Sequence, residues 1–305
     1  MFDLNIPESS LTADWGSESV LGMLVRLGYR GVAISVTCSE NLAKLKPCSI
    51  DKEKCAALVR TVANPSTIVR VSPPLLAQTL PHSIASKTFD IFTRLSISLD
   101  NPSHNYSITH GNNILKSYDI ISVQPTSEKL FQSACQNLDV DIISLDMGTR
   151  LPFFLRHPTV NSAIQRGIMF EICYSQGIRD QTARANLIAN AAALVRITKG
   201  KHVILSSEAR HAFELRAPAD VINLASLFSL NPVNAKTALT VNVRSVLVHA
   251  ATRKDTFRGV MSMEIIDQSG EPERDEESET AGQKWKMAKV KESEFISFAD
   301  FDMES

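Results

Sequence analysis

The chain has 305 residues, of which 44% are hydrophobic and 21% are charged, and this composition is ordinary for a globular protein. No run of about 18 apolar residues occurs, so a membrane span is not expected. The net charge of −1 hides an asymmetry, because thirteen Asp and Glu but only five Lys and Arg lie from residue 264 onward. That segment therefore carries −8 and the remaining body +7. A basic body favours a polyanionic partner, although +7 on so long a chain also fits an ordinary charged surface.

Strand-like and helical segments alternate along the first 249 residues. The predicted strands lie at 2–6, 31–36, 90–99, 119–123, 141–145, 168–173 and 203–205. Apolar residues at helical spacing predict helices at 17–27, 127–137, 158–166, 180–199, 220–230 and 231–249. The last of these begins with Asn231 as its N-cap and Pro232 in the first turn, and it can contain a break before residue 249. Residues 38–88 are expected to form a long insertion with one candidate helix at 50–62. Residues 264–305 are predicted to be a disordered acidic tail, so the barrel or sheet domain is 1–263.

The segment 166–206 shows the alternation most clearly. A short apolar strand is followed by a loop, by a helix with Asp180 as its N-cap, and by a second strand after Lys199 and Gly200. Two apolar strands joined by one helix predict a parallel βαβ unit. Seven such alternations indicate a parallel sheet, arranged either as an open doubly wound sheet or as a (β/α) barrel.

Polar residues on one face of almost every strand favour the barrel, because they predict one shared polar lumen. Arg94 and Glu171 are charged residues within otherwise apolar strands, so we expect them to pair across that lumen. An eighth strand is not visible in the sequence. The polar face consists of Asp3, Asn5, Ser35, Thr37, Arg94, Ser96, Ser98, Ser122, Gln124, Ser144, Asp146, Glu171 and Ser206.

The sequence gives little support for a conventional enzyme. Asp3, Asp146 and Glu171 could hold a metal or exchange protons, but the same residues could form a buried ion-pair network with Arg94. No HxH pair, GxGxxG, Walker A, GxSxG or HExxH pattern occurs. No catalytic residue, metal ligand or cofactor is therefore predicted. The five cysteines lack CxxC spacing, which indicates reduced thiols in the cytosol or nucleus.

Basic residues are predicted in the loops that follow the strands. Arginine suits bidentate phosphate contacts, and these residues on a basic body favour a nucleic-acid backbone as the partner, although each one alone also fits a solvated surface charge. Arg179, Arg210 and Arg216 are the leading candidates and are expected to be exposed. The full set of candidate RNA-binding residues is Lys116, Arg150, Arg156, Arg179, Arg210, Arg216, Arg253 and Lys254.

Several segments, in order, resemble one known family. They are RLSISLDNPSH at 94–104, SYDIISVQPTSEKLF at 117–131, LDVDIISL at 138–145, FEICYSQGIRD at 170–180 and KGKHVILSSEA with FELRAPADVINLASLF at 199–228. Together they are similar to the TIM-barrel protein subunit of ribonuclease P, which is shared with ribonuclease MRP. The resemblance covers about residues 1–254 and weakens in 38–88.

The resemblance implies a polymerase-and-histidinol-phosphatase-like (PHP-like) TIM barrel without catalytic function. It also implies a place in the nucleus and nucleolus, within a ribonucleoprotein whose RNA removes the 5′ leader of precursor tRNA. The expected partners are that catalytic RNA, precursor tRNA, a small ferredoxin-like protein subunit and other subunits. Two alternatives remain open at this point: a metal-dependent phosphoesterase of the PHP barrel superfamily, and a protein-only interaction module.

Overall fold

The computed structural model describes residues 1–11, 20–38, 47–63, 67–71, 88–100, 108 and 112–255. All of these residues belong to the first of two units of the chain, Met1–Ser262. The predicted tail at 264–305 lies outside the described residues. Within the described residues, no helix is both long enough and apolar enough to cross a membrane. The five cysteines, all of which lie among the described residues, form no disulfide.

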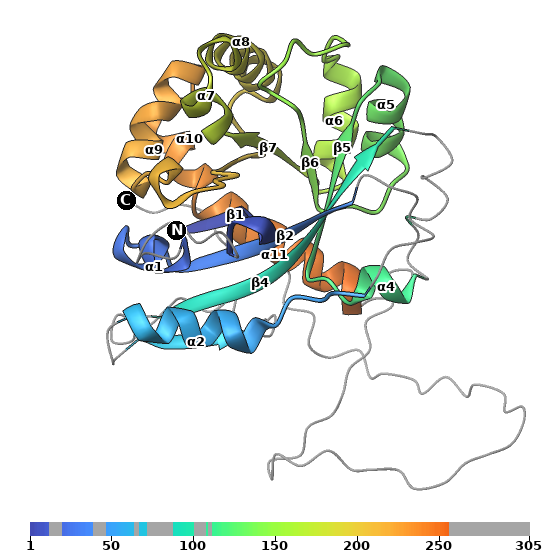
Figure 1. The fold of residues 1–305 in the computed structure, drawn as a ribbon. Coiled ribbons are helices and arrows are strands. Elements are labelled where there is room, and N and C mark those ends of the chain that lie inside the picture. Colours follow the sequence, from blue (N-terminus) through green and yellow to red (C-terminus); the bar gives the residue numbers. More distant parts are fainter. Residues whose placement is uncertain are drawn as a thin grey trace, which may run out of the picture. The chain divides into compact units, whose positions relative to one another are not determined.

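The strands of the first unit form a nearly closed parallel barrel, which confirms the predicted fold (Figure 1). Its path runs β1-β2-β4-β5-β6-β7-β8 with every neighbouring pair parallel. The strands are β1 Phe2–Pro7, β2 Gly31–Cys38, β4 Thr88–Leu99, β5 Ile120–Pro125, β6 Ile142–Ser144, β7 Met169–Cys173 and β8 Val203–Ser206.

Helices connect the strands and surround them in Figure 1. The predicted helices are present, and the predicted break in the last one separates α10 from α11. Asp180 caps α8 as expected, and the backbone after its last residue, Thr198, is left-handed at both Lys199 and Gly200. The helices are α1 Val20–Arg26, α2 Lys52–Val62, α4 Asn113–Lys116, α5 Glu128–Gln136, α6 His157–Gln165, α7 Ser175–Arg179, α8 Gln181–Thr198, α9 Pro218–Ala225, α10 Pro232–Ala238 and α11 Val241–Asp255.

The predicted insertion contains a short strand, β3 Ile68–Val71, that the sequence does not reveal. β3 pairs in parallel with the start of β4, whose twelve residues extend beyond the part that pairs with β5. Arg70 in β3 forms an ion pair with Asp90 in β4, with Nε 2.7 Å from Oδ1. β3 has only four residues, and so short a segment is too short for a strand pattern to identify.

The polar lumen that the sequence predicts occupies only the C-terminal half of the barrel interior. The strand residues nearer the N-terminal ends form an apolar layer that packs against Val243, Val246 and Leu247 of α11. The helix thereby fills the N-terminal end of the lumen, and the polar residues remain in the half that opens toward the loops. The strand side chains of the apolar layer are Phe2, Leu4, Ala33, Phe92, Ile120, Ile142, Met169 and Ile204.

Two aspartates at strand starts hold the end of α11. Asp141 is fully buried before β6 and accepts from Arg253, with Nη2 3.0 Å from Oδ2, and from His249, with Nδ1 2.8 Å from Oδ1. Burial alone would raise the pKa of Asp141, but these two partners hold the pKa below its ordinary value. Asp119, before β5, binds Lys254 with Nζ 3.0 Å from Oδ1. α11 is therefore joined to the barrel by charge as well as by apolar packing.

Candidate functional site

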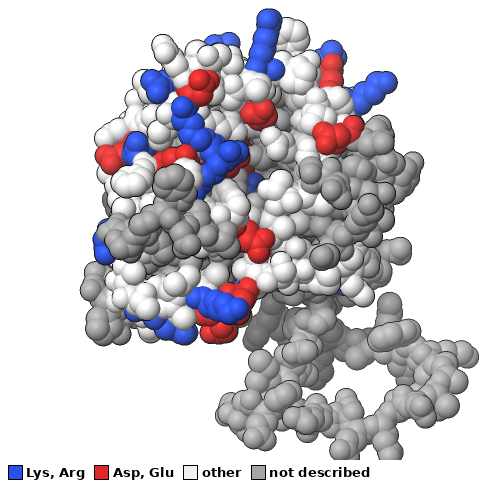
Figure 2. Space-filling view, in the orientation of Figure 1, with Lys and Arg blue, Asp and Glu red and all other residues white. Residues whose placement is uncertain are grey.

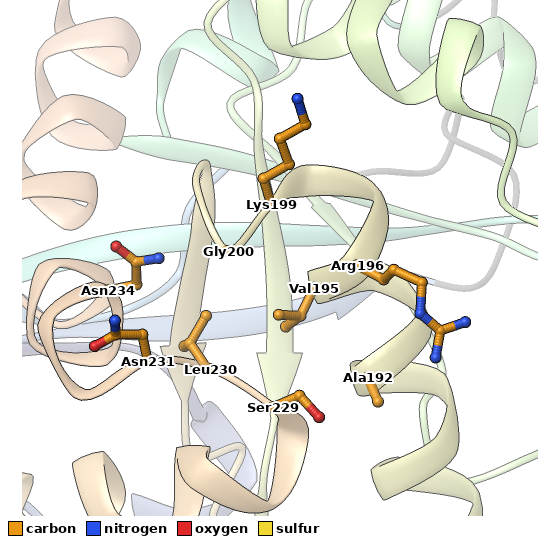
Figure 3. A pocket seen from close by; sticks show the side chains of 9 residues that line it. All are labelled: Ala192, Val195, Arg196, Lys199, Gly200, Ser229, Leu230, Asn231 and Asn234. Atoms are coloured by element: carbon orange, nitrogen blue, oxygen red, sulfur yellow. The ribbon is translucent and has the colours of Figure 1, made fainter.

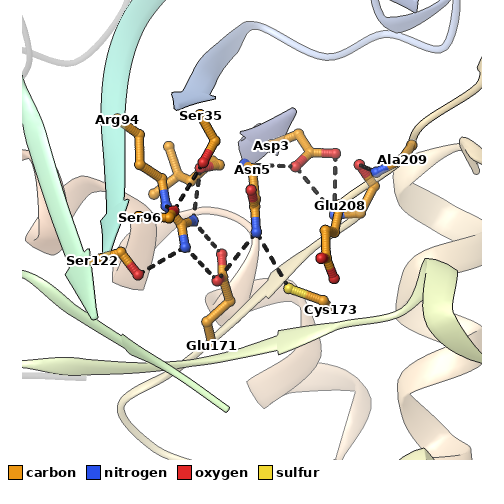
Figure 4. A network of polar contacts seen from close by, with 12 residues as sticks. Asp3, Asn5, Ser35, Arg94, Ser96, Ser122, Glu171, Cys173, Glu208 and Ala209 are labelled. Atoms are coloured by element: carbon orange, nitrogen blue, oxygen red, sulfur yellow. Dashed lines mark hydrogen bonds and ion pairs between the residues drawn. The ribbon is translucent and has the colours of Figure 1, made fainter. Parts of the chain in front are cut away.

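The polar half of the lumen is organised around Arg94 of β4 (Figure 4). All five of its N–H groups are used. Nη1 and Nη2 donate to the two carboxylate oxygens of Glu171 at 2.5 and 2.6 Å. Nη1 also donates to the Leu4 carbonyl at 2.9 Å, Nη2 to Ser122 Oγ at 2.8 Å, and Nε to Ser96 Oγ at 3.0 Å. Arg94 therefore joins four strands, and the expected pair with Glu171 is present.

Glu171 of β7 is as deeply buried as Arg94, and both side chains are almost inaccessible to solvent. Burial alone would raise the pKa of Glu171, but the adjacent guanidinium outweighs burial and holds the pKa below its ordinary value. Asn5 Nδ2 lies 3.4 Å from Glu171 Oε2 and 3.5 Å from Cys173 Sγ. The Glu171 carboxylate is thus ionised and bound to protein donors on several sides.

Asp3 and Asn5 close the barrel between β1 and β8, where the strands themselves form no ladder among the described residues. Asp3 Oδ1 accepts the N–H of Ser207 at 3.1 Å, and the carbonyl of Asn5 accepts the N–H of Glu208 at 3.0 Å. Burial raises the pKa of Asp3 to about 6, and hydrogen bonds from Ser207 and Asn5 oppose that shift. Asp3 therefore binds a proton at a higher pH than an ordinary aspartate does, while it bridges the two ends of the sheet.

Glu208 lies at the C-terminal opening of the lumen, directly after the closure. Its backbone is left-handed, with φ of 57°, and its carboxylate accepts from Gln176 Nε2 at 2.9 Å. Burial and then the charge of Glu171 raise the pKa of Glu208. The sequence analysis missed Glu208, because one Glu after a strand carries no pattern. Within the described residues, no three His, Cys, Asp or Glu side chains are grouped as metal ligands would be.

Five of the eight predicted RNA-binding residues follow strands. They lie on the loop side of the barrel, which is the side where the C-terminal ends of the strands lead into loops. Arg150 and Arg156 follow β6, Arg179 ends the helix after β7, and Arg210 and Arg216 follow β8. Figure 2 shows basic side chains gathered over α7 with acidic ones among them, so this face is mixed in charge rather than uniformly basic. Whether any of these residues contacts RNA stays a prediction.

The placement of the other three in loops after strands is wrong. Lys116 ends α4 just before β5, and Arg253 and Lys254 lie in α11, so all three are at the N-terminal ends of the strands. Arg253 and Lys254 are also already bound to Asp141 and Asp119. The sequence shows a signal for these ion pairs, because an aspartate lies directly before the start of each of the strands β5 and β6.

The expectation that Arg179, Arg210 and Arg216 are all exposed also needs correction. Arg210 is exposed, but the Arg179 side chain is only 25% exposed and lies 3.7 Å from Glu214. Arg216 is half-buried, and its Nη1 donates to the carbonyls of Phe213 and Leu215 at 2.7 and 2.8 Å. Arg216 thus stabilises its own loop, because a guanidinium can satisfy two carbonyl groups at once.

A separate pocket of about 340 Å³ lies at the opposite end of the barrel, between the end of α8 and the start of α10 (Figure 3). Arg196, Lys199, Asn231 and Asn234 give it polar walls. Asn231 is already engaged, because its side chain caps α10 by accepting the N–H of Val233. This pocket contains none of the predicted site residues.

The sequence matches a model of a known protein family. The model for "RNase P subunit p30" matches residues 1–255. The chain belongs to the RNase P subunit p30 family. Relatives support this family. The chain is 44% identical over 177 residues to "Ribonuclease P protein subunit p30" of Mus musculus, covering 58% of this chain and 66% of the relative. It is 34% identical over 279 residues to "Protein GAMETOPHYTE DEFECTIVE 1" of Arabidopsis thaliana, covering 87% of this chain and 46% of the relative.

The chain thus spans about half to two thirds of the length of these two relatives. Among solved structures, a chain of the "cryo-EM structure of archaeal Ribonuclease P with mature tRNA" superposes with a TM-score of 0.60 at 16% identity. The superposition covers 89% of this chain and all of that chain. At this identity the similarity shows a shared barrel fold.

Proposed function

We propose that the chain is a non-catalytic protein subunit of ribonuclease P, and of the related ribonuclease MRP, that supports 5′ maturation of precursor tRNA. It would do so by binding and positioning RNA and other protein subunits. The observation that carries this proposal is the family match over residues 1–255, which spans the whole described barrel. The same match supports a nuclear and nucleolar location.

The lumen supports the non-catalytic part of the proposal. A hydrolytic carboxylate must be available to a metal, a water molecule or a substrate. Glu171 is instead bound by both terminal nitrogens of Arg94, and Asp3 by two backbone N–H groups. Asp146 accepts from Gly148 N and Thr149 Oγ1 in its own loop. The carboxylates of a candidate phosphoesterase site are therefore bound to protein donors, in the barrel for Glu171 and Asp3 and in a loop for Asp146.

The loop side supports the RNA-binding part. Exposed arginines bind phosphates without reading sequence, so they would position an RNA whose own fold supplies the chemistry. The proposed partners are the catalytic RNA, precursor tRNA and a small ferredoxin-like protein subunit. Arg150 and Arg210 are the cleanest candidates for phosphate contact, because both are exposed and neither supports the loop through its guanidinium among the described contacts.

Purification of the full chain from its own cells, followed by sequencing of the RNA bound to it, tests this proposal. Ribonuclease P RNA should be enriched over total RNA, and pre-treatment with ribonuclease should remove part of the protein partners. A chain that brings down protein subunits but no enriched RNA would support a protein-only interaction module instead.

A further inference from the structure

Two loops on the C-terminal side of the barrel share a nine-residue pattern, Arg-x-x-Phe-x-Leu-Arg-x-Pro. It is RLPFFLRHP at residues 150–158, here named the β6 loop, and RHAFELRAP at residues 210–218, here named the β8 loop. In each loop the proline lies in the first turn of the helix that follows, α6 or α9. The chain therefore presents the same short pattern twice at equivalent places, between a barrel strand and its helix.

The two loops bury different positions but expose the same kind of side chain. In the β6 loop Phe153 is 7% exposed, whereas Phe154 beside it is 87% exposed. In the β8 loop the order is reversed, because Phe213 is 84% exposed and Glu214 is 8% exposed. A phenylalanine side chain that stays in water does not gain the favourable free energy that burial would give it. Two such side chains in matched loops indicate a surface that a partner covers.

The residues next to the exposed Phe154 in the β6 loop are held in place by their surroundings. Phe153 stacks on Phe131 of α5, with ring centroids 5.0 Å apart. Asn190 of α8 donates to the carbonyls of Met147 and Thr149 at 3.1 and 2.7 Å, which fixes the backbone directly before the loop. Phe154 is thus presented from a fixed backbone, so binding there would cost little ordering of the loop.

The β8 loop is fixed by different contacts with the same result. Buried Glu214 accepts the N–H of Arg210 at 2.8 Å, and Tyr174 Oη accepts the N–H of Arg216 at 3.2 Å. The guanidinium of Arg216 holds the carbonyl of Phe213 itself at 2.7 Å. The short 3-10 turn Ala212–Glu214 therefore points Phe213 into solvent while its neighbours are tied down.

Positive charge flanks both exposed rings. Arg150 and Arg210 at the loop starts are exposed, and Arg156 is 70% exposed with only the surface residue Glu128 as an ion-pair partner among the described residues. Exposed surface pairs of this kind are weak and readily exchanged. An exposed ring with an exposed arginine in the same loop matches an unpaired nucleotide, whose base can stack on the ring and whose phosphate can bind the arginine. A protein partner would instead need acidic groups around an apolar pocket.

We propose that the β6 and β8 loops are two equivalent stacking sites for unpaired RNA bases, on Phe154 and Phe213, with Arg150 and Arg210 binding the adjacent phosphates. This inference rests on the proposed role in a ribonucleoprotein. It adds that the chain distinguishes unpaired from paired RNA, since bases within a duplex are not available to stack on a side chain.

The test uses the full chain with two labelled probes, a single-stranded RNA of about 12 nucleotides and a duplex of the same length, long enough to span a typical single-strand site. Phe154→Ala and Phe213→Ala should each weaken binding of the single strand about 5- to 150-fold, the effect of removing one base–aromatic stack. Binding of the duplex should stay nearly unchanged. Both side chains are exposed, so the melting temperature should not change. Phe→Tyr at each position is the matched control and should retain binding, whereas Phe→Leu should not.

The arginine variants separate this inference from the proposed function. Arg150→Ala and Arg210→Ala should weaken both probes and lower the salt slope by roughly 0.7 for each phosphate contact removed from the single strand. If the arginine variants weaken binding but Phe154→Ala with Phe213→Ala does not, the stacking sites are wrong and the proposed function stands. If the phenylalanine variants instead release a protein subunit from the purified complex with unchanged RNA affinity, the loops dock protein and the inference is overturned.

Discussion

The ion pair between Arg94 and Glu171 should be one of the most sensitive points of the barrel. Glu171→Gln keeps the size of the side chain but removes its charge, and it places an amide N–H group against a guanidinium that only donates. Arg94 would remain buried among four strands, without a counter-charge and with only one oxygen at position 171 to accept from it. Breaking one partner of a buried pair costs about 3–5 kcal/mol, and each kcal/mol lowers the melting temperature of a domain of this size by about 2–4 °C. We therefore expect Glu171→Gln to lower the melting temperature by roughly 6–20 °C.

Urea unfolding followed by circular dichroism measures the loss in free energy of unfolding. The wild type, Glu171→Gln, Arg94→Met and the double variant are compared side by side. The double variant should be more stable than the sum of the two losses predicts, because it leaves no unpaired charge. Glu53→Gln is the matched control. Glu53 forms an exposed ion pair with Arg60 at 3.9 Å, and its loss should cost no more than about 1 kcal/mol.

Two results would refute this reasoning. The first is a free energy of unfolding for Glu171→Gln within about 1 kcal/mol of the wild-type value, which would mean that the buried guanidinium finds another partner. Alternatively, the losses of the two single variants could add fully in the double variant, which would mean that the pair is not coupled across the lumen.

Three further predictions concern the closure of the barrel, its last helix and the acidic segment. Because burial raises the pKa of Asp3 to about 6 from its ordinary 3.8, the folded protein holds this proton more tightly than the unfolded chain does. Its contribution to stability should therefore be complete below about pH 4 and fall by roughly 3 kcal/mol as the pH rises through about 6, and Asp3→Asn should flatten that slope in urea unfolding between these pH values. Asp141→Asn should cost about 3–5 kcal/mol and speed amide hydrogen exchange in α11 more than in α5, whereas equal exchange in both helices would refute a local anchor. A chain ending near residue 263 should keep its melting temperature and bind RNA at least as tightly, because the segment removed carries excess negative charge; aggregation of the shortened chain would contradict this.

The barrel itself could be predicted from the sequence because its strands are short apolar segments separated by helices with clear caps. Asp180 and Asn231 are both N-caps where the sequence places them. The pair between Arg94 and Glu171 could also be predicted, since charged residues within apolar strands need partners. These features depend on local pattern, and local pattern is what a single sequence contains.

Features that depend on three-dimensional closure could not be predicted. α11 follows the last strand in sequence, yet it fills the N-terminal end of the lumen. Arg253 and Lys254 therefore lie at the N-terminal ends of the strands, where they pair with Asp141 and Asp119. The left-handed Glu208 closes the barrel through a backbone contact with Asn5, which no side-chain pattern records. The sequence shows which residues are basic, but only packing decides which of those charges are already used.

Cleavage of precursor tRNA by the isolated chain and by the reconstituted complex tests the central proposal most directly. The isolated chain should cleave nothing, with or without Mg²⁺. The complex carrying Arg150→Ala and Arg210→Ala should cleave more slowly or bind RNA more weakly, while the cut site stays the same because the RNA holds the chemistry. Cleavage of a phosphoester by the pure chain, lost in a folded Asp3→Asn or Glu171→Gln variant, would contradict the proposal and identify a phosphoesterase.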